Sequence, residues 1–583
     1  MWPFSPSYLT IVQSKRAHRT LALASASLPS TLSSEHDKFT HATATEIVAH
    51  IEKGEWSASQ VVEAYITRAA YAQATTNCLT EVMFDWAREQ AKELDEEFAS
   101  TKKLRGPLHG VPTSFKDQFD IIGFDSTIGF TQWVNKPATT NADLVAQFIS
   151  AGAVLFVKTN VPQTMFAFEC SNPLWGRTTN PYNDKYTCGG SSGGEAALLA
   201  MDGSAVGIGS DVGGSLRIPA AYCGLYSLKP SVSRISHGGA CGPVPGFEGI
   251  KTVVGPMGRS IDDLDLVSRL VFGVQGVEQS IPPLPFREAN LPSKLRFGYY
   301  TSDNYVKASP ACKRAVLETV EALQKQGHEC IEFNVPGGES SLPPSMPAHA
   351  FNIFIGLTAA DGYKKMLSHL GPDPKENSLW LVTAGPKLPW FIRNFAAWLL
   401  ETLFSDGLFA NSLRAARVRT VLGYTELVAE REDLIKSFHK QVWEKHSLDG
   451  IIAPVQAMPQ LPHGGCDNFS GLAAATILYN VLDYPAGCIP VTRVDPVKDQ
   501  VTDEWKTGPG LGSSLLEGGL YRGKKPLYNP TETAGMPVGI QIVGKKWEEE
   551  KVLAMMRVAD DALGKDGRFG PGNWDERLKA ARS

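Results

Sequence analysis

The sequence CGGSSGGEAALLAMDGSAVGIGSDVGGSLRIP spans residues 188–219. Within it, a helical stretch at residues 193–200 precedes the apolar, strand-like run at residues 205–208. A second such run, at residues 154–157, follows a helical stretch at residues 143–151. Strands that alternate with helices are typical of a sheet with helices on both faces. The sequence therefore predicts an α/β fold, with a large mixed, mostly parallel β-sheet covered by helices on both faces.

Strand-like runs also occur late in the chain, at residues 450–453 and 538–543, and no linker separates them from the earlier ones. Residues 1–104 predict an N-terminal helical segment. Residues 105–583 then predict one α/β domain, with a helical insertion at about 386–445, and the whole chain is expected to pack as one unit.

Two capping-box patterns define helices in the N-terminal segment. Thr43-Ala-Thr-Glu46 and Ser57-Ala-Ser-Gln60 predict that residues 43–72 form two helices. Residues 78–99, rich in Ala, Glu and Lys, are expected to continue as helix. Another N-cap is predicted at Ser309, because Pro310 suits the first position of a helix.

Residues 1–34 contain no Asp or Glu, only three Lys or Arg, and many serines. This composition faintly resembles a transit peptide. The alternative, which we favour, is a surface helix over residues 8–24 with Lys15, Arg16 and Arg19 in its middle. The sequence has no run of about 18 apolar residues, so a membrane-spanning helix is not expected.

Composition excludes several classes of protein. A net charge of −5 over 583 residues argues against a nucleic-acid binder, which usually has a basic face. The nine cysteines lie singly without CxxC spacing, so neither a disulfide framework nor a zinc site is predicted. There is no HExxH motif, and no metal or other cofactor is expected. Unpaired cysteines fit a reduced, cytoplasmic setting.

Lys116 lies in the apolar, turn-rich segment GPLHGVPTSFKD at residues 106–117. A lone lysine is usually a solvated surface charge, but burial lowers the pKa of a lysine side chain. Lowering it by about three units costs about 4 kcal/mol, which a fold tolerates only for a compensating function. Lys116 is therefore a candidate general base, because a neutral lysine can accept a proton near pH 7.

Two serines are candidate nucleophiles. Gly189-Gly-Ser-Ser-Gly193 matches the G-x-S-x-G nucleophile elbow, which would use Ser191 and require a downstream Asp and His. Asp449 and His463 could serve, although nothing in their sequence context singles them out. Alternatively, the glycines before Ser215 allow consecutive backbone N–H groups to point one way and hold an oxyanion.

Together these segments resemble the amidase signature family. Its hallmarks are a V-P-x-S-x-K-D-like string, a GGSSGG string and a D-x-G-G-S-x-R string, and all occur here in that order, at residues 111–117, 189–194 and 211–217. The resemblance is dense over about residues 105–235 and weaker over most of the remaining chain. Val212 and Leu216 are conservative departures, because the family often has Ile at these two positions.

The resemblance implies that Ser215 is the acyl-forming nucleophile, Ser191 a bridging serine in a cis peptide and Lys116 the base. It favours a serine–lysine variant of the catalytic triad over an elbow at Ser191. It also implies an oxyanion hole of backbone N–H groups, a backbone position beside the substrate and three supporting side chains. The oxyanion hole would use the N–H groups of Val212, Gly213, Gly214 and Ser215, and the backbone position is that of Met165. The supporting side chains are Ser192, Asp211 and Arg217, and the last two could pair across the turn.

The implied reaction is hydrolysis of a carboxylic amide to an acid plus ammonia or an amine. Within the family the chain looks closest to fungal acetamidase-like and fatty acid amide hydrolase-like members. One helical face carries Phe391, Phe395, Trp398 and Leu399, followed by Arg414, Arg417 and Arg419. This pattern suits either a core helix pair or a monotopic membrane cap, which would contact intracellular membranes peripherally through residues 389–409.

With Phe166 and Phe168 near the expected substrate position, the aromatic helix favours a hydrophobic or fatty acyl amide. The alternatives are a short-chain aliphatic amidase, a glutamine-hydrolysing amidotransferase subunit and a non-catalytic scaffold. The expected partner is a small-molecule amide, no nucleic acid is expected, and a homodimer is left open.

Overall fold

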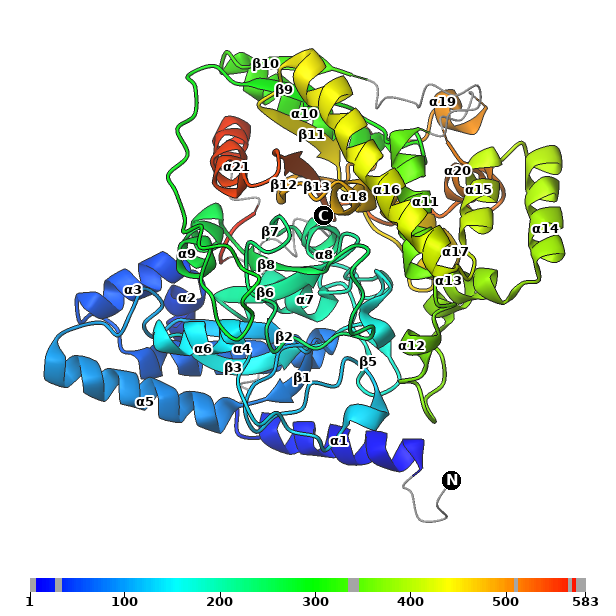
Figure 1. The fold of residues 1–583 in the computed structure, drawn as a ribbon. Coiled ribbons are helices and arrows are strands. Elements are labelled where there is room, and N and C mark those ends of the chain that lie inside the picture. The colour runs from blue at the N-terminus through cyan, green and yellow to red at the C-terminus, as the bar shows by residue number, and fades with distance from the viewer. Residues whose placement is uncertain (1–6, 27–33, 334–344, 508–511, 565–568, 573–583) are drawn as a thin grey trace.

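The computed structural model describes residues 7–26, 34–333, 345–507, 512–564 and 569–572. Its centre is an 11-stranded sheet that runs through the whole molecule (Figure 1). In sheet order the strands are β1 (Leu79–Val82), β3 (Val154–Thr159), β2 (Pro112–Lys116), β6 (Val206–Asp211), β8 (Val253–Gly258), β7 (Tyr226–Lys229), β12 (Ala486–Arg493), β13 (Pro537–Val543), β11 (Gly450–Pro454), β9 (Arg296–Tyr299) and β10 (Glu329–Glu332).

The parallel pairing lies in two blocks. Strand β2 runs parallel to β3 and β6, and β9 runs parallel to β10 and β11. Antiparallel pairs join the blocks through β8, β7, β12 and β13 and also add β1 at one edge, so they outnumber the parallel pairs. The predicted mixed sheet is confirmed, but among the described strands it has four parallel and six antiparallel pairs, so its parallel share is smaller than the expected mostly parallel pairing.

Helices cover both faces of this sheet. On β13, a Cβ at Gly539 would lie 3.2 Å from Ala221 of α8 (Arg217–Cys223). On β12, Gly487 instead faces Met556 of α21 (Glu549–Leu563). Gly487 pairs with Ile542, three residues from Gly539, and side chains alternate along a strand. Helices α8 and α21 therefore pack on opposite faces, as predicted.

The N-terminal helices form largely as expected. Helix α1 (Tyr8–Leu23) is present, and α3 (Ala44–Glu52) and α4 (Ala58–Thr76) both begin with complete capping boxes. Residues 1–6 and 27–33 of the predicted N-terminal segment lie outside the described residues. The expectation of continuous helix over 78–99 is wrong at its start, because β1 occupies the first part and α5 (Phe84–Thr101) begins only afterwards.

The basic residues of α1 are not a solvated cluster. Lys15 is buried and forms ion pairs of 2.6 Å with both Glu81 and Asp125. Arg16 donates to the Leu174 carbonyl at 2.7 Å, and Arg19 donates to a backbone carbonyl of β1. The three basic side chains of α1 thus bind this helix to the rest of the protein.

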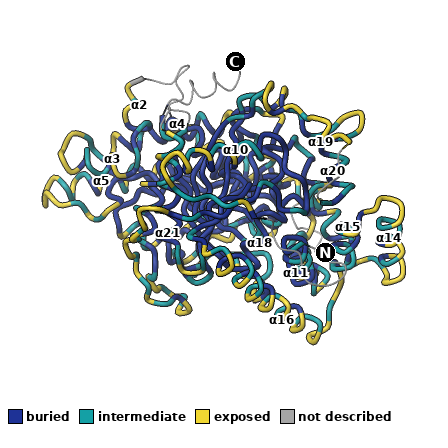
Figure 2. The backbone as a smooth tube through the Cα atoms, turned by 90° about the horizontal axis from the view of Figure 1, so that it is seen from above, coloured by how far each residue is buried: buried dark blue, intermediate teal, exposed yellow. Residues whose placement is uncertain are grey.

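The segment 386–445 is helical with short breaks. It contains α14 (Trp390–Leu403), α15 (Gly407–Ala415), α16 (Val421–Phe438) and a π-helical turn at His439–Glu444. Helix α14 stands at the outer edge of the molecule, where Figure 2 shows exposed backbone. Phe391, Phe395 and Trp398 are each more than half exposed. Among the described residues, no helix is long and apolar enough to cross a membrane.

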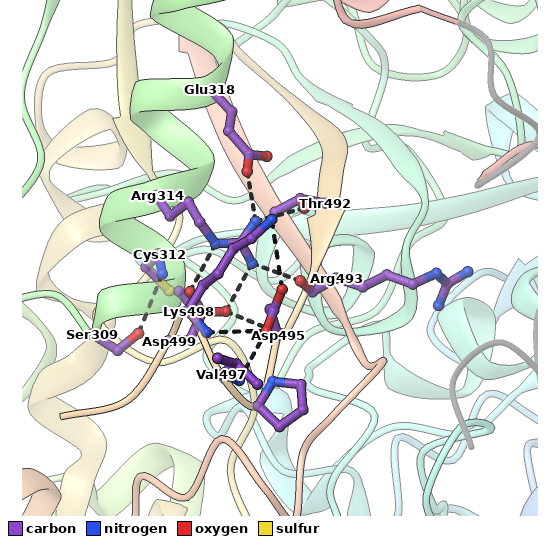
Figure 3. A network of polar contacts seen from close by, with 12 residues as sticks. Ser309, Cys312, Arg314, Glu318, Thr492, Arg493, Asp495, Val497, Lys498 and Asp499 are labelled. Atoms are coloured by element: carbon purple, nitrogen blue, oxygen red, sulfur yellow. Dashed lines mark hydrogen bonds and ion pairs between the residues drawn. The ribbon is translucent and has the colours of Figure 1, made fainter. Parts of the chain in front are cut away.

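Helix α10 (Pro310–Lys325) begins at the predicted cap, with Cys312 N–H donating to Ser309 Oγ at 3.3 Å. One turn later, Arg314 holds the segment after β12 in a network of polar contacts (Figure 3). Its guanidinium makes two bonds of 2.7 Å to the buried carboxylate of Asp499. The remaining α-helices are α2 (Ser34–Thr40), α6 (Asp143–Ser150), α7 (Gly193–Ala200), α9 (Ile261–Val271), α11 (Met346–Thr358), α12 (Lys364–Leu367), α13 (Trp380–Ala384), α17 (Cys466–Phe469), α18 (Ala474–Val481), α19 (Asp503–Lys506) and α20 (Ser514–Tyr521).

Candidate active site

Ser215 lies on the tight turn that joins β6 to α8. Asp211, the last residue of β6, closes this turn because its carboxylate accepts from the N–H groups of Gly214 at 2.7 Å and Leu216 at 3.1 Å. Gly214 has a φ of +123°, and a Cβ there would collide with Thr476. The turn therefore requires glycine before Ser215, which places the hydroxyl at the end of a strand.

A buried ion pair braces the turn, as predicted. Arg217 Nε and Nη2 each lie 3.1 Å from a carboxylate oxygen of Asp211, and both residues are fully buried. Arg217 also donates to Asn480 at 2.6 Å and to Gln541 at 2.9 Å. Burial alone would raise the pKa of Asp211, but Arg217 holds that pKa well below its usual range. The carboxylate therefore stays ionised at all working pH values.

Lys116, the last residue of β2, is fully buried beside this turn. Its Nζ lies 2.7 Å from Ser191 Oγ and 2.8 Å from Ser210 Oγ. Burial lowers the pKa of Lys116 from 10.5 to about 7, against the opposing charge of Asp211. Near neutral pH a substantial share of Lys116 is unprotonated, as a general base requires.

Ser191 accepts a hydrogen bond from Lys116 and belongs to the segment that precedes α7. The Gly190–Ser191 peptide bond is cis, and α7 begins two residues after Ser191. Ser192, the next residue, joins this segment to the turn, since its N–H donates to the Ser215 carbonyl at 3.2 Å. Within the described residues, Ser215 Oγ makes no hydrogen bond, but Ser191 and Ser215 line the same cavity. The three predicted residues thus come together, with a direct bond for Lys116–Ser191 only.

The predicted oxyanion hole needs one correction. The Gly214 N–H is occupied by Asp211, so it is not available to a ligand. Across the described part of the chain, the N–H groups of Val212, Gly213 and Ser215 have no internal acceptor. These three donors are the ones that the turn leaves for an oxyanion.

Two cavities meet at Ser215. The first encloses about 1100 Å³, its open mouth included, and is lined mainly by apolar and aromatic side chains of α11, α13 and α15. Phe166, Phe168 and Met165 contribute to its wall. Met165 also lines the second cavity, with Val212 and Ser215. These residues stand where the two cavities join.

The second cavity holds about 1690 Å³ of space, its open mouth included, and its lining is more polar. His237 on its wall was not predicted, because no sequence motif surrounds it. The His237 Nε2 atom is buried without a hydrogen-bond partner among the described residues. Burial lowers the pKa of His237 against the opposing charge of Glu278, and the charge of Lys116 adds to the lowering. The wall of this cavity therefore includes an imidazole whose buried Nε2 has no hydrogen-bond partner among the described residues.

Sequence reasoning also missed Ser210, which contacts Lys116, and Glu195, whose charge acts on Lys116. Ser210 Oγ accepts from Lys116 and donates to Gln118 Oε1 at 2.5 Å. Glu195 of α7 is fully buried and accepts from Thr159 at 2.6 Å. Burial raises the pKa of Glu195 to about 7. Only their positions in the sequence could have indicated these two residues, since Ser210 lies one residue before Asp211 and Glu195 follows the GGSSGG string.

The residues needed for an elbow at Ser191 lie elsewhere. Asp449 accepts from the Arg296 N–H at 2.9 Å and pairs with Lys551. His463 Nε2 lies 2.8 Å from the Asp184 carbonyl. Neither residue lines either cavity at Ser215. The geometry therefore favours Lys116 as the base.

A family model described as Amidase matches residues 60–553. The chain belongs to the amidase signature family. The chain is 34% identical to fatty-acid amide hydrolase 1 of Sus scrofa over 88% of this chain and 84% of the relative. The chain is also 32% identical to an acetamidase of Emericella nidulans over 91% of each chain.

A solved structure of fatty acid amide hydrolase superimposes with a TM-score of 0.76 at 28% identity, covering 97% of this chain and 92% of that one. The predicted family and fold are therefore confirmed, and this member of the amidase family is a hydrolase of amides.

Proposed function

We propose that this amidase cleaves amides of hydrophobic acids through an acyl-enzyme on Ser215. The observation that carries the proposal is the apolar cavity that ends at Ser215, beside a lysine whose pKa lies near 7. A cavity lined by aromatic and aliphatic side chains favours an apolar ligand, because burying apolar area contributes about 25 cal/mol per Å².

The first step begins at neutral Lys116. Ser210 Oγ already donates to Gln118, so it accepts one N–H of the amine and leaves the amine's lone pair for the Ser191 hydroxyl. Ser191 gives its proton to Lys116 and takes the proton of Ser215. The Ser215 oxygen then forms a bond to the amide carbonyl carbon. The N–H groups of Val212, Gly213 and Ser215 stabilise the resulting oxyanion.

The relay then runs backwards. Lys116 returns its proton through Ser191 to the amide nitrogen, the C–N bond breaks, and the amine or ammonia leaves. A water molecule gives its proton to the same relay and attacks the ester carbonyl. The acid departs when Ser215 regains its proton. The ionised Asp211–Arg217 pair takes no proton and keeps the turn in place.

The two cavities receive the two sides of the amide. The apolar cavity, with Phe166 and Phe354 stacked 5.9 Å apart, suits the acyl chain. The more polar cavity, whose lining includes Ser191, Ser210 and Glu278, suits the amine.

Helix α14 supports contact with a membrane. Its aromatic face is exposed, so the alternative that it is a core helix is wrong. Helix α14 packs on α15, whose Phe409 and Leu413 line the acyl cavity. A helix that buries such a face in a lipid interface brings the cavity close to apolar substrates.

A hydrolysis panel tests the proposal. Amides of one amine with acyl groups from acetyl to long-chain acyl are compared at equal concentration. We expect kcat/KM to rise with chain length until the cavity is filled, by up to about tenfold for every two buried methylenes, at about 0.8 kcal/mol each. Rates that are flat or highest for acetyl would favour the short-chain amidase, and ammonia from glutamine alone would favour the amidotransferase subunit.

A further inference from the structure

A pocket lined by arginines lies on the far side of α15 from the acyl cavity. Ser412, Leu413 and Ala416 of this region face the acyl cavity, whereas Arg414 and Ala415 face the pocket. The pocket holds about 790 Å³ of space, its open mouth included, between α11, α14, α15 and α16. Four arginines line it: Arg393, Arg414, Arg417 and Arg419. Figure 1 shows these helices gathered at the edge of the molecule that carries α14.

Three of these arginines have no carboxylate partner among the described residues. Arg393, which is 7% exposed, donates only to the Leu388 carbonyl, at 3.3 Å. Arg419 donates to the carbonyls of Gly356 at 3.3 Å and Ala415 at 3.4 Å. A guanidinium carries five N–H donors, so most of their donors are free. Only Arg414 is neutralised, by two bonds to Glu401.

The charges in the pocket repel one another. Burial lowers the pKa of Arg393, and the neighbouring charge of Arg417 lowers it further. Burial and then Arg417 also lower the pKa of Arg419, although Glu430 and Glu426 oppose this. Glu430 is the acidic group on the wall, and it is engaged by His349 at 2.6 Å. An anion between the arginines would relieve this repulsion.

We propose that this pocket binds a phosphate group. Guanidinium groups match phosphate oxygens with two parallel N–H donors, and such bonds are about twice as strong as neutral ones. Trp390 of α14 lines the same pocket and is 70% exposed, so the pocket opens beside the aromatic face. A phosphate carried by a lipid headgroup and a free phosphate compound share this chemistry, and the experiment separates them.

Binding of inorganic phosphate is the first test, and it uses no amide substrate, so it is independent of the proposed function. Phosphate should raise the Tm of the full chain above that in sodium chloride of equal ionic strength, because a ligand of the folded state stabilises it. Arg417→Gln should weaken phosphate binding by about tenfold or more, since it removes a charge-assisted contact. Lys436→Gln, which removes an exposed cation of α16, is the matched control and should bind as the wild type does.

The second test identifies the source of the phosphate. Flotation with phosphatidylcholine vesicles, with and without phosphatidic acid, is compared for the wild type and both variants. Extra binding to phosphatidic acid that Arg417→Gln loses and Lys436→Gln keeps supports a lipid headgroup, and phosphate binding without that extra binding supports a free compound. The proposal is overturned if phosphate has no specific effect on the wild type, or if both variants lose it equally. Arg417 is exposed, so its replacement leaves the packing of buried Arg393 intact.

Discussion

Replacing Lys116 with methionine should stabilise the protein while it abolishes turnover. Because the pKa of Lys116 falls from 10.5 to about 7, holding this amine in its buried position is unfavourable at neutral pH. At about 1.36 kcal/mol per unit of pKa, the cost at pH 7 is roughly 4 kcal/mol. Methionine removes that cost but leaves the Ser191 hydroxyl without its partner, which costs about 1–3 kcal/mol. We expect Lys116→Met to gain about 1–3 kcal/mol in the free energy of unfolding at pH 7.

The gain must depend on pH in a defined direction. Between about pH 7 and pH 10.5 the unfolded chain binds a proton on Lys116 that the folded chain does not, so wild-type stability rises with pH across this window. At pH 10 the cost of Lys116 has fallen to roughly 1 kcal/mol, and the advantage of the variant should shrink by about 3 kcal/mol. Urea denaturation followed by tryptophan fluorescence measures both values, with exposed Lys436→Met as control. An advantage that is absent at pH 7, or equal at both pH values, would refute the buried neutral lysine.

Three further measurements test Lys116 and two buried ion pairs. The kcat/KM for a soluble amide should fall about tenfold per pH unit below pH 7 and level off above it, because only unprotonated Lys116 is competent; a pH–rate profile that is flat between pH 5 and 7 would contradict this. Asp211→Asn leaves buried Arg217 without its counter-ion and should lower the free energy of unfolding by about 3–5 kcal/mol, as read from urea denaturation. Asp499→Ala should lower the free energy of unfolding by a similar amount, because Arg314 loses its buried partner. Glu318→Ala removes a partly exposed partner of the same arginine and should lower it by less than about 1 kcal/mol. Equal losses of stability in the two variants would count against the buried pair.

The turn at Ser215 could be predicted from the sequence because its contacts are local. Asp211, two glycines and Arg217 lie within seven residues, and the expected pair between Asp211 and Arg217 is present. The direction in which each backbone N–H of the turn points cannot be read from the motif. Gly214 N–H turns toward Asp211, whereas the neighbouring N–H groups stay free, and a motif cannot distinguish these amides.

Contacts between segments that are distant in the chain could not be predicted from the sequence. Lys15, Arg16 and Arg19 look solvated in a chain segment without acids, but Lys15 meets Glu81 and Asp125. Strand β1 was missed because only four residues of it interrupt a helical composition. The apolar face of α14 was visible as a pattern, yet core and membrane-facing helices share that pattern, and only exposure separates them. The arginine pocket combines four helices, and no single helix reveals it.

Covalent labelling with a fluorophosphonate probe tests the central assignment most directly. The probe phosphonylates an activated serine, and peptide mass spectrometry locates the adduct. We expect one adduct, on Ser215, that disappears in Ser215→Ala and forms at least about a hundredfold more slowly in Lys116→Ala, because base catalysis contributes about 10²–10⁴-fold. An adduct on Ser191 would contradict the assignment of the nucleophile. Labelling of Ser215 at an unchanged rate without Lys116 would contradict the assignment of the base.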